Sequence, residues 1–518
     1  MIENYNGFQL SRKQKIIILS FSGLTLFIHL YTNLFANYGI FRDELYYIAC
    51  TKRITAGYVD QPPLSIYILA VSRWLFGESL FAIRLLPAIT AAVTVYLTGL
   101  ITARLGGKSV SIIIACITLT FSPVFLGMNT IFSMNTFDNF FWVFSAYLVI
   151  RIIQYNKPAF WILLGLSIGL GMLNKISMAW FGAGLFAGLL FTPLRVHLKT
   201  KYPWLAALIA LIIFSPFIVW NFTHDFAHLE FIRNATRLKY SGLTPIDFIA
   251  GQLILPGPFS ILVWLPGILY LFFSKEMENY RMIGIIFLTT VLILIINWHT
   301  KAEYLAAAYP IVFAGGGLFW EKAVRGKKII WFKYAVIFLV LASGIISIPL
   351  ALPILPVETS IKYSRIINVA PQNSEHQKLA ELPQFYADMF GWEDLARTVS
   401  SVYNTIPDSE KKYTIVFASN YGEAGAVEYY TGKYDLPPVV CPHNSYWYWG
   451  YPDKKDIKTV IVIGGSREDQ LKSCKDVRVA AIHKTEYSMP YENNLPISIC
   501  RELIRSIEEI WKSSKFFI

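Results

Sequence analysis

Three carboxylates within one short stretch are the residues of this sequence best suited to chemistry. Asp43 and Glu44 are adjacent, and Asp60 precedes Gln61 and two prolines. A carboxylate that is partly shielded from water can take the proton of a hydroxyl group as that oxygen attacks an electrophilic carbon. Acidic residues in an exposed loop are more often simply solvated. The residue types alone therefore leave both readings open.

The elements that position these carboxylates are predicted to be membrane spans. Of 518 residues, 55% are hydrophobic and 15% are charged, and the mean hydropathy is +0.46. Apolar runs of about 20 residues, enough to cross a hydrocarbon core of about 30 Å, recur through the first 350 residues. We expect about eleven spans, at residues 16–36, 80–103, 109–128, 137–153, 159–173, 177–193, 203–220, 247–273, 282–297, 303–320 and 329–351.

The loops between these spans alternate in charge, and this sets the orientation. Short cytoplasmic loops carry an excess of Lys and Arg, so the N-terminus is predicted inside. The segment 38–79, which holds the three carboxylates, and the tail are then outside. The net charge of +12 reflects this topology and not nucleic-acid binding. The basic loops contain Arg12, Lys13, Lys15, Arg104, Lys108, Arg151, Lys157, Arg195, Lys199, Lys201, Lys275, Arg281, Lys322, Arg325, Lys327, Lys328 and Lys333.

The tail from about residue 357 to 518 has a different pattern. Its apolar runs shorten to strand length at Thr414, Thr459 and Val477, and they alternate with helix-like pieces such as the one from Trp392. We expect residues 1–356 to form the membrane domain and residues 357–518 a soluble α/β domain outside the membrane. Pairing among Cys441, Cys474 and Cys500 cannot be deduced from the sequence.

The outer loop resembles the first-loop signature of glycosyltransferase family 39 in the GT-C superfamily, in Asp43-Glu44 and in Gly57-Tyr58-Val59-Asp60-Gln61-Pro62-Pro63-Leu64. That family includes protein O-mannosyltransferases, lipid A aminoarabinose transferases and Rgt-type lipopolysaccharide galacturonosyltransferases. Further matches are Ser133-Met134-Asn135 with Asp138, Leu173-Asn174-Lys175, Trp220-Asn221 with His224-Asp225, and Lys301-Ala302-Glu303-Tyr304-Leu305 with Tyr309-Pro310. The segments 390–394, 419–425 and 443–447 of the tail resemble a bacterial branch of the family.

The resemblance implies a GT-C fold and an inverting sugar transfer on the outer face of a bacterial inner membrane. The donor would be a polyprenyl-phosphate sugar, and the acceptor a glycolipid such as lipopolysaccharide or lipid A, another glycan or a protein hydroxyl. Asp43 would be the general base, with Glu44 and Asp60 tuning or positioning it. Asp138 would belong to the substrate site. The resemblance implies no metal and no cofactor.

One departure from the family concerns the donor phosphate. Aminoarabinose transferases have a Lys before the two prolines, where this chain has Gln61. We therefore expect the phosphate contact from Arg84, Lys175 and Lys301, which lie near outer span ends, because an anion beside a low-dielectric wall requires cations. Snorkelling at the membrane interface is the alternative role for each of them. Tyr304 is expected to line the donor groove or to belong to the aromatic belt.

A transporter or flippase is the alternative function, because it also has many spans with few charges. The break at Pro256-Gly257-Pro258 inside one span is compatible with either class. The outer acidic loop distinguishes them, since a transferase needs it and a transporter does not. The sequence does not name the sugar, the acceptor or the length of the carrier lipid, because specificity depends on pocket shape.

Overall fold

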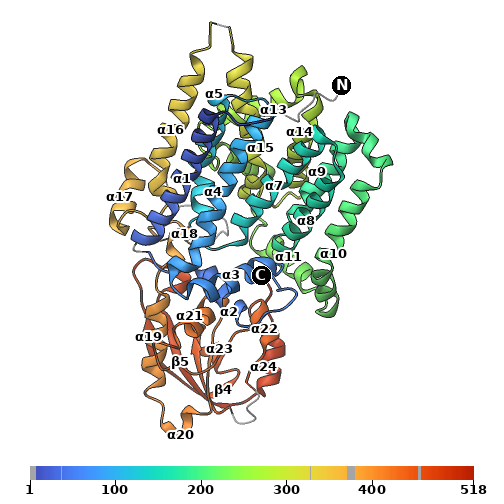
Figure 1. Ribbon diagram of the computed structural model, residues 1–518. Helices are drawn as coiled ribbons and strands as arrows, with labels where there is room; N and C mark the ends of the chain where they lie inside the picture. The colour runs from blue at the N-terminus through green and yellow to red at the C-terminus, as the bar shows by residue number, and fades with distance from the viewer. Residues whose placement is uncertain (1–7, 37, 327, 370–377, 379, 453–456) are drawn as a thin grey trace.

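The computed structural model describes residues 8–518 except 37, 327, 370–377, 379 and 453–456. It has a helical region above and a smaller domain with a sheet below (Figure 1). Lys327 of the last basic loop lies outside the described residues. The helical region contains α1 (Arg12–Phe35), α2 (Arg42–Thr51), α3 (Leu64–Phe76), α4 (Leu80–Arg104), α5 (Ser109–Thr120), α6 (Pro123–Met128), α7 (Met134–Tyr155), α8 (Pro158–Asn174), α9 (Met178–Phe191), η2 (Pro193–Lys199), α10 (Tyr202–Thr223), α11 (Ala227–Leu238), α12 (Pro245–Ile254), α13 (Ile261–Phe273), η3 (Lys275–Tyr280), α14 (Arg281–Ile296), η4 (Ala302–Ala308), α15 (Tyr309–Leu318), η5 (Phe319–Ala323) and α16 (Phe332–Ala351).

All the spans expected from the sequence coincide with helices, but several of these helices are short or broken. Among the described residues, seven helices are long and apolar enough to cross a membrane, or eight if α9 and η2, which bend by 105°, count as one. The predicted span 247–273 is divided into α12 and α13, because the two prolines beside Gly257 interrupt the helix and Gly257 has φ +109°. The predicted span 109–128 is likewise divided into α5 and α6.

Close helix contacts through glycine hold the centre of the membrane region together. A Cβ on Gly316 of α15 would lie 2.1 Å from the Val263 carbonyl oxygen of α13, and one on Gly267 would lie 2.1 Å from the Val312 carbonyl oxygen. Only glycine permits this close approach. Inside lipid there is no hydrophobic driving force between helices, so van der Waals contacts at such sites hold them together. The outer helices α10 and α16 instead expose apolar side chains, as expected of a surface that faces lipid.

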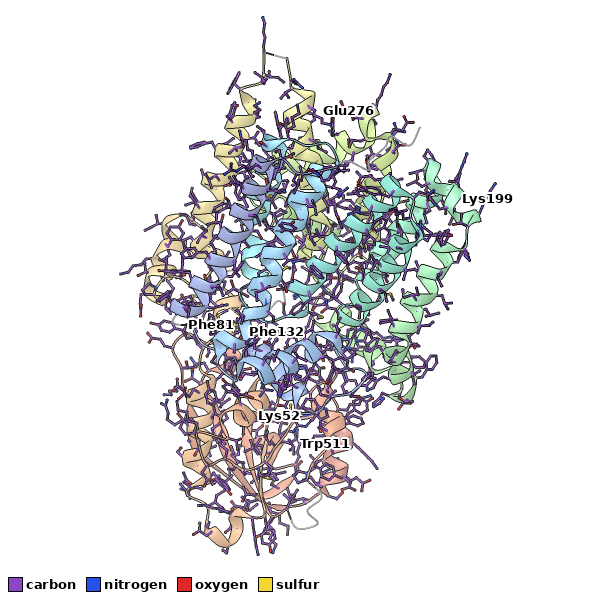
Figure 2. The ribbon with its side chains drawn as sticks, in the orientation of Figure 1. Lys52, Phe81, Phe132, Lys199, Glu276 and Trp511 are labelled. Atoms are coloured by element: carbon purple, nitrogen blue, oxygen red, sulfur yellow. A yellow bond between two sulfur atoms is a disulfide. The ribbon has the colours of Figure 1, made fainter. Side chains whose placement is uncertain are left out.

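The basic loops and the sheet domain lie at opposite ends of the molecule. Lys199 and Glu276 mark the basic end in Figure 2, whereas Trp511 lies in the sheet domain at the other end. The helices α2 and α3 lie between the membrane helices and the sheet domain (Figure 1). The outer loop that carries Asp43 and Asp60 therefore forms the junction between the two parts of the chain.

The C-terminal part contains the strands and helices that the tail pattern predicts. Its five strands are ordered β2-β1-β3-β5-β4, with β1 parallel to β2 and β3, and β5 antiparallel to β3 and β4. Cys474 and Cys500 form a disulfide between β4 and β5, and Cys441 is free and buried. The elements are α17 (Val357–Ile366), α18 (Gln384–Ala387), α19 (Trp392–Tyr403), α20 (Asp408–Lys411), β1 (Thr414–Phe417), α21 (Tyr421–Tyr430), β2 (Val439–Val440), α22 (Ser445–Trp449), β3 (Thr459–Ile463), α23 (Arg467–Gln470), β4 (Cys474–His483), η6 (Pro490–Glu492), β5 (Leu495–Leu503) and α24 (Ile507–Ser514). The proposed domain boundary at residue 356 falls between α16 and α17.

Glu423 and Glu492 are neighbouring acidic side chains that are buried in this domain. Glu423 on α21 accepts a hydrogen bond from the Ser419 backbone N–H at 2.7 Å, and Glu492 accepts one from the Asn420 amide at 2.9 Å. Burial raises the pKa of Glu423 to about 8 and also raises the pKa of Glu492, which the nearby charge of Glu423 raises further. The two carboxyl groups therefore favour their neutral forms near pH 7.

This pair predicts a loss of stability at alkaline pH. Because the pKa of Glu423 is higher in the folded than in the unfolded chain, its contribution is present below about pH 4.5 and is lost as pH rises through about 8. The slope between these values is about 1 kcal/mol per pH unit. Glu423→Gln should flatten the fall in Tm between pH 6 and pH 9. Glu393→Gln is the control, because Lys433 lowers the pKa of Glu393 and its effect belongs to acidic pH. Equal alkaline slopes in Glu423→Gln and the parent would refute this account.

Candidate active site

Asp43 lies in the first turn of α2, at the junction of the two parts of the chain. Its side chain is 35% exposed, and Oδ1 lies 3.6 Å from Arg42 Nε. The hydroxyl of Tyr421, from α21 of the C-terminal part, donates a hydrogen bond of 2.8 Å to the same oxygen. Oδ2 forms no hydrogen bond or ion pair with the residues that the structure describes. One oxygen of Asp43 is therefore fixed, while the other is open to an incoming hydroxyl.

Glu44, the next residue, is buried and fully engaged. Arg84 Nε donates to Glu44 Oε1 at 2.8 Å, and Arg84 Nη2 donates to Oε2 at 2.7 Å. The backbone N–H groups of Phe41 and Phe132 also donate to this carboxylate, at 2.9 and 2.7 Å. Figure 2 labels Phe132 beside the outer loop. Glu44 thus caps α2 and joins it to α4 and to the segment before α7.

The Arg84 guanidinium is bound to Glu44, whereas the sequence analysis expected it at the donor phosphate. Its side chain is 2% exposed, and besides the two bonds to Glu44 it donates to the Gly39 carbonyl at 3.2 Å. A buried guanidinium with this set of acceptors holds the outer loop against α4. A role of Arg84 at the donor phosphate stays a prediction.

Asp60 lies close to Asp43 across the aromatic side chains of α2. The Tyr46 hydroxyl donates to Asp60 Oδ1 at 2.7 Å. Burial raises the pKa of Asp60 to about 6, against the lowering effect of the Tyr46 hydrogen bond, and the charge of Asp43 raises it further. Burial and the charges of Asp43 and Asp60 also raise the pKa of Tyr47. The two carboxylates and the two tyrosines thus share one environment.

The loop around Asp60 is held from both sides. The Val59 N–H donates to Ser445 Oγ of the C-terminal part at 3.0 Å, and the Val59 carbonyl is 2.9 Å from His228 Nδ1 of α11. Gln61 is fully buried, and its Nε2 has no hydrogen-bond partner among the described residues. An unsatisfied buried amide is costly, so this donor is suited to a bound ligand.

A second group contains Lys175, Asp138 and Tyr304. Lys175 Nζ donates to Asn135 Oδ1 at 2.8 Å, lies 3.6 Å from Asp138 Oδ2 and lies 5.2 Å from the centre of the Tyr304 ring. Asp138 is buried and accepts a hydrogen bond from Ser177 Oγ at 2.8 Å. The Lys175 charge is therefore held by one carboxylate and one aromatic face.

Lys301 adjoins this second group through Tyr240. Lys301 Nζ lies 4.9 Å from the centre of the Tyr240 ring and 3.8 Å from Glu303 Oε1. Tyr240 in turn lies next to Tyr304. Lys239, the neighbour of Tyr240, acts on the charge of Asp60. We call Lys175, Lys301, Tyr240 and Tyr304 the cation cluster; Lys239 connects it to the carboxylates.

Sequence reasoning did not single out several residues of this junction: Arg42, Tyr46, Lys239, Tyr240 and Tyr421. Lys239 and Tyr240 lie in a predicted outer loop, so their side of the membrane could be inferred but their proximity to Asp60 could not. Tyr421 lies in one of the tail segments that match the family. No local pattern indicates that it reaches Asp43.

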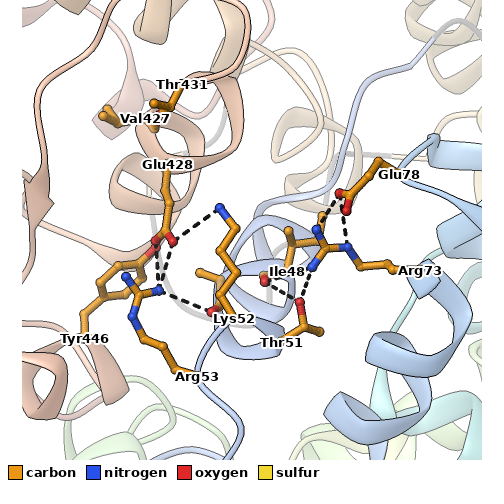
Figure 3. A network of polar contacts seen from close by, with 11 residues as sticks. Ile48, Thr51, Lys52, Arg53, Arg73, Glu78, Val427, Glu428, Thr431 and Tyr446 are labelled. Carbon is orange, nitrogen blue, oxygen red and sulfur yellow. Dashed lines mark hydrogen bonds and ion pairs between the residues drawn. The ribbon is translucent and has the colours of Figure 1, made fainter.

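An ion-pair network fastens the far end of α2 to the C-terminal part (Figure 3). Glu428 of α21 accepts from Arg53 Nη1 at 2.9 Å and from the Tyr446 hydroxyl at 3.0 Å, and it lies 3.4 Å from Lys52 Nζ. The guanidinium of Arg53 also covers the Trp449 ring at 4.4 Å. Both ends of α2 are thus bound to α21.

The fold is that of the GT-C glycosyltransferases. The crystal structure of ArnT from Cupriavidus metallidurans bound to undecaprenyl phosphate is similar with a TM-score of 0.60 at 11% sequence identity, over 94% of this chain and 97% of that chain. The apo form of the same protein gives a TM-score of 0.59 at 10% identity, over 94% and 97%.

Residues 60–220 match the family described as dolichyl-phosphate-mannose-protein mannosyltransferase. A search of curated proteins gave no match. The resemblance inferred from the sequence is thereby confirmed: residues 60–220 match this family, and the GT-C fold extends over nearly the whole chain.

Proposed function

We propose that this chain is a membrane glycosyltransferase that moves a hexosyl or pentosyl group from a polyprenyl-phosphate-linked donor to a hydroxyl of an envelope acceptor. The observation that carries this proposal is the state of Asp43, which has one oxygen held by Tyr421 and the other open, while the charge of Lys239, the neighbour of Tyr240 in the cation cluster, acts on the nearby Asp60. A base needs the open oxygen, and a phosphate leaving group needs the cations.

The proposed reaction is a single displacement with inversion. The acceptor oxygen attacks the anomeric carbon and gives its proton to Asp43. The bond between this carbon and the phosphate oxygen breaks, and its electron pair leaves on the polyprenyl phosphate. Lys175 and Lys301 stabilise the negative charge of the leaving group, and the Gln61 amide is available to the donor. Glu44 and Arg84 hold the loop that carries the base.

The donor class is supported by the ArnT structure, which has undecaprenyl phosphate bound. The acceptor remains open among lipopolysaccharide, lipid A, another glycan and a protein hydroxyl.

Neutralising either lysine of the cation cluster is expected to weaken use of the donor. Lys175→Gln and Lys301→Gln should each raise the KM for a polyprenyl-phosphate sugar about tenfold to a hundredfold, because a charge-assisted hydrogen bond to phosphate contributes about 1.5 to 3 kcal/mol. Because Lys175→Gln also leaves the buried Asp138 without its cation, thermal unfolding must show that this variant is folded before its KM is compared. The measurement is the initial rate of transfer against donor concentration.

Lys472→Gln is the matched control, because Lys472 is an exposed lysine of the C-terminal part paired with Asp469. Its KM should equal that of the parent. Unchanged KM values in both cluster variants would remove these lysines from the donor site.

We propose that the active site faces outward from a bacterial inner membrane, with the N-terminus in the cytoplasm. The basic loops lie at the end remote from the sheet domain, which supports this orientation. The disulfide between Cys474 and Cys500 also supports it, because disulfides persist in oxidising compartments. A reporter fused after residue 400 should be active outside, and activity only in the cytoplasm would reverse the orientation.

Mass spectrometry of envelope glycolipids and glycoproteins tests the function in cells. Cells that lack the gene should lack one sugar on one acceptor, and the parent gene should restore it. Identical glycan profiles in cells with and without the gene, under conditions where the protein is made, would contradict the proposal.

A further inference from the structure

The C-terminal part supplies a group that directly contacts the candidate base. Tyr421 lies 378 positions after Asp43 in the chain, and its hydroxyl is 2.8 Å from Asp43 Oδ1. Its ring packs between Tyr46 and His443, at centroid distances of 4.9 and 4.8 Å. The Arg42 guanidinium lies 5.5 Å from the ring centre. Three neighbours thus fix the ring, and the hydroxyl is directed at Asp43.

The start of α21 is built to hold Tyr421 in place. Asn420 caps the helix, because its side-chain oxygen accepts hydrogen bonds from the N–H groups of Gly422 and Glu423 at 2.9 and 3.1 Å. The Asn420 amide in turn donates to the buried Glu492. A capped first turn that is tied to a buried carboxyl group gives the Tyr421 backbone little freedom.

Two glycines bring α21 this close to α2. A Cβ on Gly422 would lie 2.7 Å from Arg42 Cγ, and one on Gly425 would lie 2.9 Å from Leu45 Cβ. The two glycines are three residues apart and share one helix face. Larger side chains on this face would push α21 away from α2 and move the Tyr421 hydroxyl from Asp43.

We propose that Tyr421 is a positioning residue for Asp43, so that the C-terminal part completes the active site. This inference rests on the proposed function of Asp43. The hydrogen bond fixes Oδ1 and directs Oδ2 to the acceptor hydroxyl.

Tyr421→Phe tests the inference in the full-length protein, because it keeps the ring and removes only the hydroxyl. We expect kcat for sugar transfer to fall about tenfold, the loss typical of one hydrogen bond to a charged group. The KM for the polyprenyl-phosphate donor should be unchanged, since Tyr421 does not belong to the cation cluster. The Tm should also be unchanged, so that the fall in kcat stands alone. A purely structural role would lower the Tm or change the KM as well.

Two other tyrosines serve as matched controls. Tyr446→Phe removes a 3.0 Å hydrogen bond to Glu428 at the same interface, and Tyr434→Phe removes a 2.7 Å bond to Glu393 away from it. Both should keep the kcat of the parent. A fall in kcat as large in Tyr446→Phe as in Tyr421→Phe would mean that general loosening of the interface is the cause, and would overturn the inference.

The possible failures can be told apart. If the parent transfers sugar, Asp43→Asn does not, and Tyr421→Phe matches the parent in kcat, only the role of Tyr421 is refuted. If the parent transfers no sugar from any polyprenyl-phosphate donor, the proposed function is refuted, and the role of Tyr421 with it.

Discussion

Replacing Asp43 by Asn is expected to lower kcat for sugar transfer by about 100-fold to 10,000-fold, the usual contribution of a general base. Asparagine has the same size and can still accept the hydrogen bond from Tyr421, so the local structure should be preserved. It cannot take the proton of the acceptor hydroxyl. Binding of the lipid donor should persist, because the phosphate is anionic and loses nothing when a nearby carboxylate becomes neutral.

The control for this variant is Glu78→Gln, which neutralises a side chain that is 66% exposed in the same outer loop and paired with Arg73. It should leave kcat within a factor of about two, because exposed ion pairs contribute little. Full activity of Asp43→Asn would move the base to Asp60 or Asp138. Loss of donor binding in Asp43→Asn would instead show that this carboxylate acts in binding.

Replacing Arg84 by Met is expected to have the largest effect on stability. The change leaves the Glu44 carboxylate buried without its cation, and breaking a buried ion pair costs about 3 to 5 kcal/mol. The double variant Glu44→Gln and Arg84→Met should recover part of this loss, because no unpaired charge is then left inside. Thermal unfolding of the purified proteins measures both. Lys472→Met is the control, since Lys472 and its partner Asp469 are both exposed.

The same experiment separates the two roles considered for Arg84. If Arg84→Met keeps the Tm of the parent but loses affinity for the donor, Arg84 contacts the phosphate, as the sequence-based interpretation expected. If the Tm falls and the remaining folded protein binds the donor normally, the role of Arg84 is to neutralise the buried Glu44 carboxylate. The four hydrogen bonds to the Glu44 carboxylate favour the second result.

The membrane architecture could be predicted because it depends on local sequence. The length and apolarity of a run predict a span whatever the run packs against. In the tail, short apolar runs that alternate with helical pieces predicted the strands from Thr414 and Thr459. The breaks inside spans were harder to place. Pro256-Gly257-Pro258 carries a visible signal, but the boundary between α5 and α6 depends on neighbouring helices as well as on Pro123.

The partners of the site residues could not be predicted, because they are long-range. A cation near an outer span end has the same local pattern whether it faces a phosphate, as proposed for Lys301, or a buried carboxylate, as Arg84 does. Tyr421 meets Asp43 only because α21 packs on α2 through Gly422 and Gly425. The family resemblance identified the segment that contains Tyr421, but it did not indicate the contact.

Sugar transfer by the purified protein in proteoliposomes tests the central claim most directly. The donor is a polyprenyl-phosphate sugar labelled separately in the sugar and in the phosphate, and envelope extract supplies the acceptor. A glycosyltransferase separates the two labels: the sugar label should move to the acceptor while the phosphate label stays on the lipid. Asp43→Asn should abolish this separation. Movement of both labels together across the bilayer, with no label on the acceptor in either protein, would contradict the account and favour a flippase.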